Sequence, residues 1–139
     1  MMMSATDNQK LPMQLKSISP ILWTKDMDET IRFYRDTLGF SARSNFPDFV
    51  SLSKGNIDIM FIVPKLPEDC PPEGGEFFSS PTLTGSLFIL MTDVDNFWQS
   101  IKQRVTVKTP LADREYLMRD FSILDNNGYE LVFGQDISQ

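Results

Sequence analysis

Residues 19–26 read SPILWTKD, and residues 86–93 read SLFILMTD. Each stretch begins with a serine, continues as an apolar run typical of a β-strand, and ends in an aspartate that precedes a helix-like pattern. The serine and the aspartate have the same spacing in both stretches. A repeated strand-then-helix unit predicts two copies of one module, and paired modules usually leave a cleft between them.

The overall composition is that of an ordinary globular protein. The chain has 139 residues, of which 41% are hydrophobic and 23% charged, so one domain can bury a substantial core. The net charge of −6 argues against a nucleic-acid partner, because binding to phosphates needs clustered Lys and Arg. The same acidity permits a cationic ligand. No apolar run is long enough to span a membrane.

The N-terminal residues and the cysteine content indicate a location. Residues 1–7 have neither the basic region nor the apolar region of a secretory signal. Cys70 is the only cysteine, so no internal disulfide can form, and a reducing compartment is the simplest interpretation. We therefore expect a cytoplasmic protein.

The first module is expected over residues 15–63, after a loose, unpatterned tail at 1–14. A strand over 18–24 leads into a helix that Asp26 caps and that Gly39 ends, since glycine accepts the left-handed conformation found after helices. Apolar residues recur at helical spacing between these two positions. Three further strands are expected at residues 40–45, 49–53 and 57–63.

The second module is expected over residues 86–135, after a Pro-rich linker at 64–85 that has no periodicity. Its first strand starts at Ser86, and Thr92 or Asp93 is expected to cap its helix. The remaining strands are expected at residues 105–107, 117–124 and 129–133. Each module is then βαβββ, which predicts an α+β fold of two tandem modules in one domain, residues 15–135.

Both ends of this domain resemble a known family. The segment ISPILWTKDMDETIRFYRDTLGF (18–40) resembles the opening of the glyoxalase/bleomycin-resistance/extradiol-dioxygenase proteins, the vicinal oxygen chelate superfamily. The segment RDFSILDNNGYELVFGQ (119–135) resembles the closing hairpin of that family, with Asn126 where proline is usual. The resemblance implies two modules whose curled sheets enclose a cleft. It also implies a homodimer, with clefts formed either within one chain or across subunits.

Metal-dependent relatives carry their ligands at the start of each module's first strand and on its last strand. The resemblance places these positions at Ser19, Met60, Ser86 and Val132. Hydroxyl, thioether and isopropyl groups do not form a zinc, nickel or iron site, which needs imidazole or carboxylate donors, and the chain has no histidine. A shift of register would bring in Asp58 or Glu130 but leave the serines. We therefore expect no metal and no cofactor.

Strand alternation predicts which other side chains line the cleft. If the two serines face it, the lining is mostly apolar and aromatic, with two carboxylates. Such a surface suits a bulky amphipathic ligand, and an aromatic cation in particular, through stacking and charge. The candidate binding residues are Ser19, Trp23, Asp58, Met60, Ser86, Phe88, Glu130 and Val132; no catalytic residue is assigned.

Several alternatives stay open at this level. Trp23 provides either a ring on which a ligand stacks or a packing group, and Asp58 with Glu130 are either an acid/base pair or solvated strand residues. Three functions compete: a metal-free binding protein similar to bleomycin-resistance proteins, a glyoxalase-type lyase or isomerase with an atypical site, and an interaction module with a collapsed cleft. Whether the protein is an enzyme is therefore left open.

Overall fold

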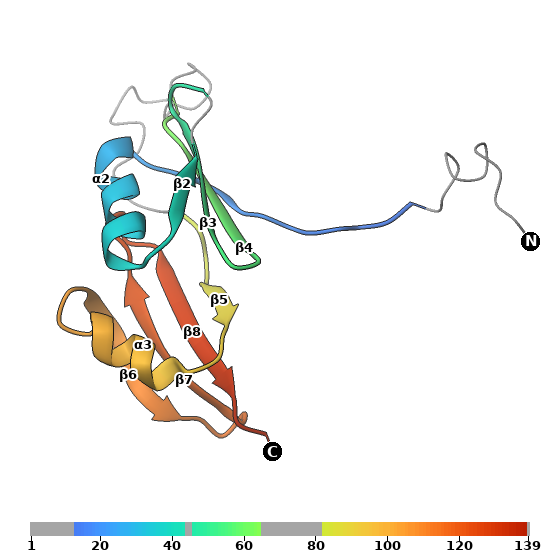
Figure 1. Ribbon diagram of the computed structural model, residues 1–139, viewed down its shortest axis with the longest axis vertical. Coiled ribbons are helices and arrows are strands. Elements are labelled where there is room, and N and C mark those ends of the chain that lie inside the picture. Colours follow the sequence, from blue (N-terminus) through green and yellow to red (C-terminus); the bar gives the residue numbers. More distant parts are fainter. Residues whose placement is uncertain (1–12, 44–45, 65–81, 139) are drawn as a thin grey trace, which may run out of the picture.

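Two four-stranded sheets of identical topology make up a computed structural model that describes residues 13–43, 46–64 and 82–138 (Figure 1). Sheet A contains, in spatial order, β1 (Ile21–Trp23), β4 (Ile57–Ile62), β3 (Phe49–Lys54) and β2 (Ser41–Arg43). Sheet B contains, in the same order, β5 (Leu87–Leu90), β8 (Glu130–Asp136), β7 (Met118–Leu124) and β6 (Thr106–Asp113). The α+β prediction with two tandem βαβββ modules is confirmed.

The strand registers show which residues of the two modules correspond. In sheet A, Ile21 of β1 lies beside Met60 of β4, and in sheet B, Phe88 of β5 lies beside Val132 of β8. The strand pairs β1–β4 and β5–β8 are parallel. All other neighbouring strands in the two sheets are antiparallel. Met60 and Val132 therefore hold equivalent positions.

The helix of the first module consists of α2 (Met27–Arg32) followed by a π-helical turn, η1 (Phe33–Thr37). The Asp26 carboxylate accepts a hydrogen bond from the backbone N–H of Glu29 at 3.0 Å, so Asp26 is the expected cap. Gly39 follows the helix with φ +83, a conformation that glycine adopts without strain. Side-chain periodicity alone does not reveal the wider π-turn.

The helix of the second module, α3 (Val94–Ile101), begins differently from the prediction. Asp93 occupies the cap position, but its backbone is left-handed (φ 57) and its side chain caps no backbone N–H. The Val94 N–H instead donates to the side-chain oxygen of Gln135, on β8, at 2.9 Å. Gln135, which is distant in sequence, thus caps the helix in place of Thr92 or Asp93.

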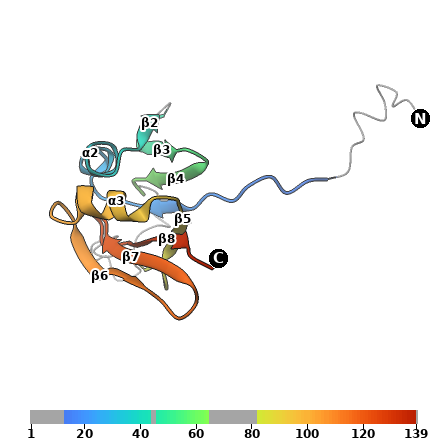
Figure 2. The same ribbon diagram turned by 60° about the horizontal axis from the view of Figure 1, so that its bottom comes forward.

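Two strands differ most in length from the expectation, and β8 also continues beyond its expected end, to Asp136. The strand expected over 18–24 covers only β1, and the segment before it extends away from both sheets (Figure 2). The strand expected over 105–107 continues to Asp113. It contains Pro110, which normally argues against a strand but is tolerated here because β6 lies at the edge of sheet B. The expected tail and linker lie mostly outside the described residues.

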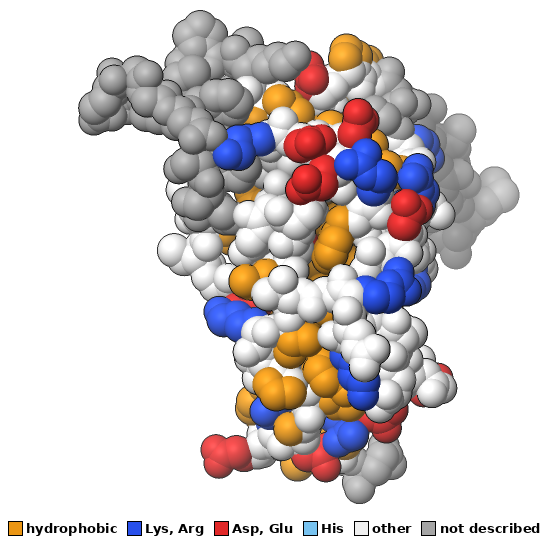
Figure 3. All heavy atoms as spheres, turned by 90° about the vertical axis from the view of Figure 1, so that its left-hand side faces the viewer, with side chains coloured by type: hydrophobic (Ala, Val, Ile, Leu, Met, Phe, Trp, Pro, Cys, Tyr) orange, Lys and Arg blue, Asp and Glu red, His pale blue; other side chains and the backbone are white. Residues whose placement is uncertain are grey.

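In each module the helix covers one side of the sheet, and the hydrophobic core lies between the helix and the sheet. In sheet A the covered side carries Phe61, which contacts Tyr34 at a ring-centroid distance of 5.3 Å. In sheet B it carries Phe133, whose centroid lies 4.9 Å from that of Phe97 on α3. Side chains on alternate strand positions form the opposite side, which we call the open face. Figure 3 shows the helix-bearing side, where acidic and basic side chains are interspersed.

A polar seam joins the two modules. The turn 125–128 of the second module lies against the first module, where Tyr34 donates a hydrogen bond to Asp125 at 2.6 Å. Asn127 accepts from Thr24 at 2.8 Å, and Asn126 donates to Thr30 at 2.9 Å. Burial raises the pKa of Asp125. The sequence predicted this segment only as a turn, whereas the structure shows that it also fixes how the modules sit together.

None of the helices in the described residues is long and apolar enough to cross a membrane.

Candidate functional site

The open face of sheet A centres on Asp58. Its carboxylate accepts hydrogen bonds from Ser51 at 2.5 Å, from Ser53 at 3.2 Å and from Ser19 at 3.4 Å. The predicted cleft residues Ser19 and Asp58 are therefore in contact. Met60 lies on the same face, two positions along β4. Because three serine hydroxyls already donate hydrogen bonds to the Asp58 carboxylate, the polar groups of this cluster satisfy one another.

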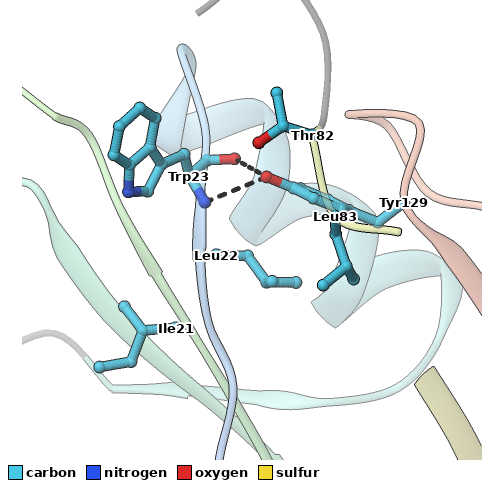
Figure 4. A pocket seen from close by; sticks show the side chains of 6 residues that line it. All are labelled: Ile21, Leu22, Trp23, Thr82, Leu83 and Tyr129. Carbon is cyan, nitrogen blue, oxygen red and sulfur yellow. Dashed lines mark hydrogen bonds between the residues drawn. The ribbon is translucent and has the colours of Figure 1, made fainter. Parts of the chain in front are cut away.

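Trp23 lies on β1, at the edge of sheet A that faces the second module. Its backbone N–H donates to the Tyr129 hydroxyl at 3.2 Å, and that hydroxyl donates to the Trp23 carbonyl at 2.9 Å. Figure 4 shows Ile21 and Trp23 on one side of β1 and Leu22, Leu83 and Tyr129 on the other. These side chains line a pocket of about 210 Å³. Tyr129 is thus a group that holds the two modules together.

The open face of sheet B is more apolar and more exposed. Phe88 and Leu90 of β5 are 50% and 63% exposed, and Ser86 precedes them as an exposed residue. Phe88 leans over the neighbouring strand, because a Cβ built on Gly134 would lie 2.6 Å from Phe88 Cζ. The absence of a side chain at Gly134 therefore makes room for the aromatic ring.

Glu130 and Val132 lie on the same open face, on β8. Glu130 accepts a hydrogen bond from Lys108 of β6 at 3.0 Å. Val132 lies opposite Ser122 of β7. Both Glu130 and Val132 line a pocket of about 240 Å³ with Ser122 and Asp120. Of the eight predicted residues, three thus lie in strands of sheet A and three in strands of sheet B, while Ser19 and Ser86 precede the first strand of their module.

A buried charge pair next to this pocket was missed by the sequence analysis. Asp120 is 3% exposed and accepts hydrogen bonds from Arg114 at 2.8 Å and from Tyr116 at 2.8 Å. The hydrogen bond to Asp120 raises the pKa of Tyr116. The sequence analysis assigned no role to Asp120. A signal in the sequence is that Asp120 and Ser122 lie two positions apart, so strand alternation places both on one face of β7.

A third pocket, of about 390 Å³, opens at the boundary between the modules. Phe40, Phe97 and Phe133 contribute to its walls, and none of the eight predicted residues lines it. Lys54 reaches this boundary, where it donates to the Leu38 carbonyl at 2.9 Å and lies 5.0 Å from the Phe97 ring centroid. The lysine is therefore engaged with the protein itself.

The four residues that the resemblance places at metal-ligand positions do not have the side chains of a catalytic metal site. The Ser19 hydroxyl donates to Asp58, and Met60, Ser86 and Val132 bring no charged donor. Within the described residues there is no group of three or more His, Cys, Asp or Glu side chains that could hold a metal ion. The chemistry of this face is that of hydroxyls, isolated carboxylates and apolar groups.

Comparisons with known proteins agree with the fold. A structure of a protein of unknown function from Agrobacterium tumefaciens is 22% identical, with TM-score 0.71, and the match covers 91% of this chain and 98% of that one. A glyoxalase/bleomycin resistance protein/dioxygenase from Alicyclobacillus acidocaldarius is 19% identical (TM-score 0.67; 88% and 92% covered). TioX from Micromonospora sp. is 17% identical (TM-score 0.66; 89% and 98% covered). These likenesses concern the fold alone.

A search of curated proteins gave no match. The sequence model of the Glyoxalase/Bleomycin resistance protein/Dioxygenase superfamily matches residues 15–133, which include every strand except the end of β8. Because this match spans nearly all of both modules, the chain belongs to the Glyoxalase/Bleomycin resistance protein/Dioxygenase superfamily.

Proposed function

We propose that this protein binds a bulky amphipathic small molecule on the open faces of its sheets, without a metal. The observation that carries the proposal is the exposure of apolar side chains on these faces: Ile21 is 57%, Phe88 50% and Leu90 63% exposed. Apolar walls with a few convergent polar groups are typical of small-molecule sites. The polar groups here are Asp58, with its hydroxyls, and Glu130.

The donor set supports binding rather than metal-assisted chemistry. A catalytic zinc, nickel or iron site requires imidazole or carboxylate ligands that converge on one point. Ser19 and Asp58 satisfy each other, and Glu130 is held by Lys108. A planar aromatic cation fits best, because aromatic side chains attract the cation and the chain carries a net charge of −6.

We further propose that a second copy of the chain covers the open faces. Each chain has one open face per module, so sheet A of one copy can pack against sheet B of the other. The two-fold symmetry of such a dimer then also pairs sheet B of the first copy with sheet A of the second. Isologous pairing of this kind leaves neither face in water, and the ligand lies between the two sheets. The single cysteine and the acidic composition support a cytoplasmic location with no nucleic-acid partner.

Trp23 provides a direct test of binding on sheet A. In a Trp98→Phe variant, which leaves Trp23 as the only tryptophan, N-methylacridinium is expected to quench the fluorescence saturably by at least half. The reason is that a planar cation in van der Waals contact with the excited indole accepts an electron from it, and this transfer falls off steeply with distance. The matched control is Trp23→Phe, in which Trp98 packs against Phe121 on the helix side, at a centroid distance of 4.9 Å. Linear, equal quenching in both variants would show only collisions and contradict the proposal.

Metal binding is tested separately. Addition of Ni²⁺, Zn²⁺, Mn²⁺ or Fe²⁺ in threefold excess is expected to change Tm by less than about 1 °C. A ligand of the native state stabilises it appreciably only when its concentration exceeds its dissociation constant, and we expect no tight metal site here. The measurement is a thermal-shift series with metal analysis of the purified protein. One equivalent of tightly bound metal would refute the metal-free proposal and favour a glyoxalase-type lyase or isomerase.

A further inference from the structure

The two modules carry a serine at the same place but give it different surroundings. Ser51 of β3 lies opposite Met60, and Ser122 of β7 lies opposite Val132, so the two serines are equivalent. Ser51 donates to Asp58 at 2.5 Å. Ser122 is 2% exposed, and its Oγ has no hydrogen-bond partner among the described residues. A buried hydroxyl without a partner is costly, so the missing partner needs an explanation.

The reason for the difference lies in the carboxylate two positions earlier on the last strand of each module. Asp58 is short and stays within reach of Ser51, whereas its counterpart Glu130 is one methylene longer and extends to Lys108 of the edge strand. The Glu130 side chain is 20% exposed in this ion pair. As a result, the second module has a pocket of about 240 Å³ with an unpartnered hydroxyl in its wall.

The hydrogen-bonding groups around this pocket are mostly acceptors. Arg114 is directed at protein oxygens: its Nε donates to the Asp120 carboxylate, and its Nη2 donates to the carbonyls of Pro110 and Asp120. Tyr116 donates its proton to the same carboxylate, which leaves its oxygen lone pairs for acceptance. Lys108 is directed at Glu130. A ligand group entering the pocket therefore meets acceptor oxygens of Tyr116, Asp120 and Glu130, together with the adaptable hydroxyls of Thr109 and Ser122.

We infer that this pocket, defined by Ser122, Glu130 and Val132, receives a hydrogen-bond-donating head group of the ligand, an ammonium or a hydroxyl. The inference rests on the proposed binding function and adds the place and chemistry of the head group. The donor pairs with Ser122 Oγ and a Glu130 oxygen. The apolar body of the ligand lies along Val132 toward the exposed ring of Phe88, which is the neighbour of Val132 on β5. A carboxylate head group is expected to bind more weakly, because it cannot donate a hydrogen bond to Glu130 and carries the same charge.

Three probes with one aromatic body test the head group: 1-naphthylmethylamine, 1-naphthylmethanol and 1-naphthoate. Titration calorimetry of the full chain is expected to show that the amine and the alcohol bind at least tenfold more tightly than the carboxylate. Equal affinity of all three, or tightest binding of naphthoate, overturns the inference but leaves the binding function standing. Absence of binding by all three overturns both.

The serine is tested with a matched pair of variants. Ser122→Ala is expected to weaken binding of the amine and the alcohol about tenfold, with Tm unchanged or raised, because the lost hydroxyl has no partner in the free protein. Ser100→Ala removes a hydroxyl from an exposed position of α3, on the helical side of sheet B, and is expected to leave the affinity unchanged. The inference is wrong if Ser122→Ala keeps the wild-type affinity for both probes, or if the two variants weaken binding equally.

Discussion

Replacing Asp125 by alanine is expected to lower the free energy of unfolding by about 3–5 kcal/mol, measured by urea unfolding at neutral pH. Asp125 is 6% exposed, and its carboxylate accepts hydrogen bonds from the Tyr34 hydroxyl and from the backbone N–H groups of Asn127 and Tyr129. Alanine leaves these donors without a partner inside the seam between the modules. The loss is large because several partners depend on one side chain.

Two further variants separate the individual contacts. Tyr34→Phe removes only the hydroxyl and is expected to cost about 1–2 kcal/mol. Asp125→Asn keeps an oxygen for the two backbone N–H groups and is expected to cost less than alanine. In a double-mutant cycle, Tyr34→Phe and Asp125→Ala should be clearly non-additive, because they share one hydrogen bond. Additive effects would show that the seam does not depend on this pair.

The pH dependence of stability follows from the same burial. Burial raises the pKa of Asp125 above its ordinary value of 3.8, so the native state binds the proton more tightly than the unfolded state. The contribution of this group is therefore most favourable below pH 3.8 and is lost as pH rises through the native pKa. As pH rises from 3.8 through the native pKa of Asp125, the wild type should therefore lose stability relative to Asp125→Asn. A constant difference between the two proteins from pH 3.5 to 7 would contradict this.

Replacing Leu90 by glutamate is expected to weaken self-association by about 100-fold, measured by sedimentation equilibrium. Leu90 is 63% exposed in the single chain, so the substitution does not disturb the core. In the proposed dimer the same side chain is covered by the partner's sheet. Loss of its apolar contact, together with burial of a carboxylate without a partner, costs about 3 kcal/mol, which corresponds to that change in affinity.

The control for this variant places the same charge on the helical side of the molecule, away from the proposed dimer interface. Gln99 is an exposed residue of α3, on the helical side of sheet B. Gln99→Glu adds the same negative charge and is expected to leave the dimer intact. A wild-type protein that is monomeric at 100 µM, or a Leu90→Glu variant that associates like the wild type, would contradict the proposed second copy.

The two modules have retained one backbone plan while their open faces have diverged. Asp58 is held by three hydroxyls of its own sheet, whereas Glu130 is held by a lysine of an edge strand. At this position the modules differ by one methylene group and one ion pair. Equivalent positions in a repeat therefore need not carry equivalent chemistry, and a ligand would meet a closed polar cluster on sheet A and an open pocket on sheet B.

The architecture followed from local features of the chain. The two stretches at 19–26 and 86–93 predicted the repeat, and the alternation within β4 and β8 predicted which side chains share the open face. Asp26 and Gly39 marked the first helix because caps act within a single turn. Such signals are short in range, so they are visible in one sequence.

The sequence by itself therefore determined the repeat, the α+β fold and the residue types of the open faces, including the donor set that does not suit a metal. Only the tertiary structure decided which partner each polar group found. Gln135 caps α3 from another strand, Asp125 is buried beneath Tyr34, and Ser122 is left without the carboxylate that its counterpart Ser51 has. These pairings depend on the distances between side chains of segments that are far apart in the chain. A local sequence pattern carries no information about those distances.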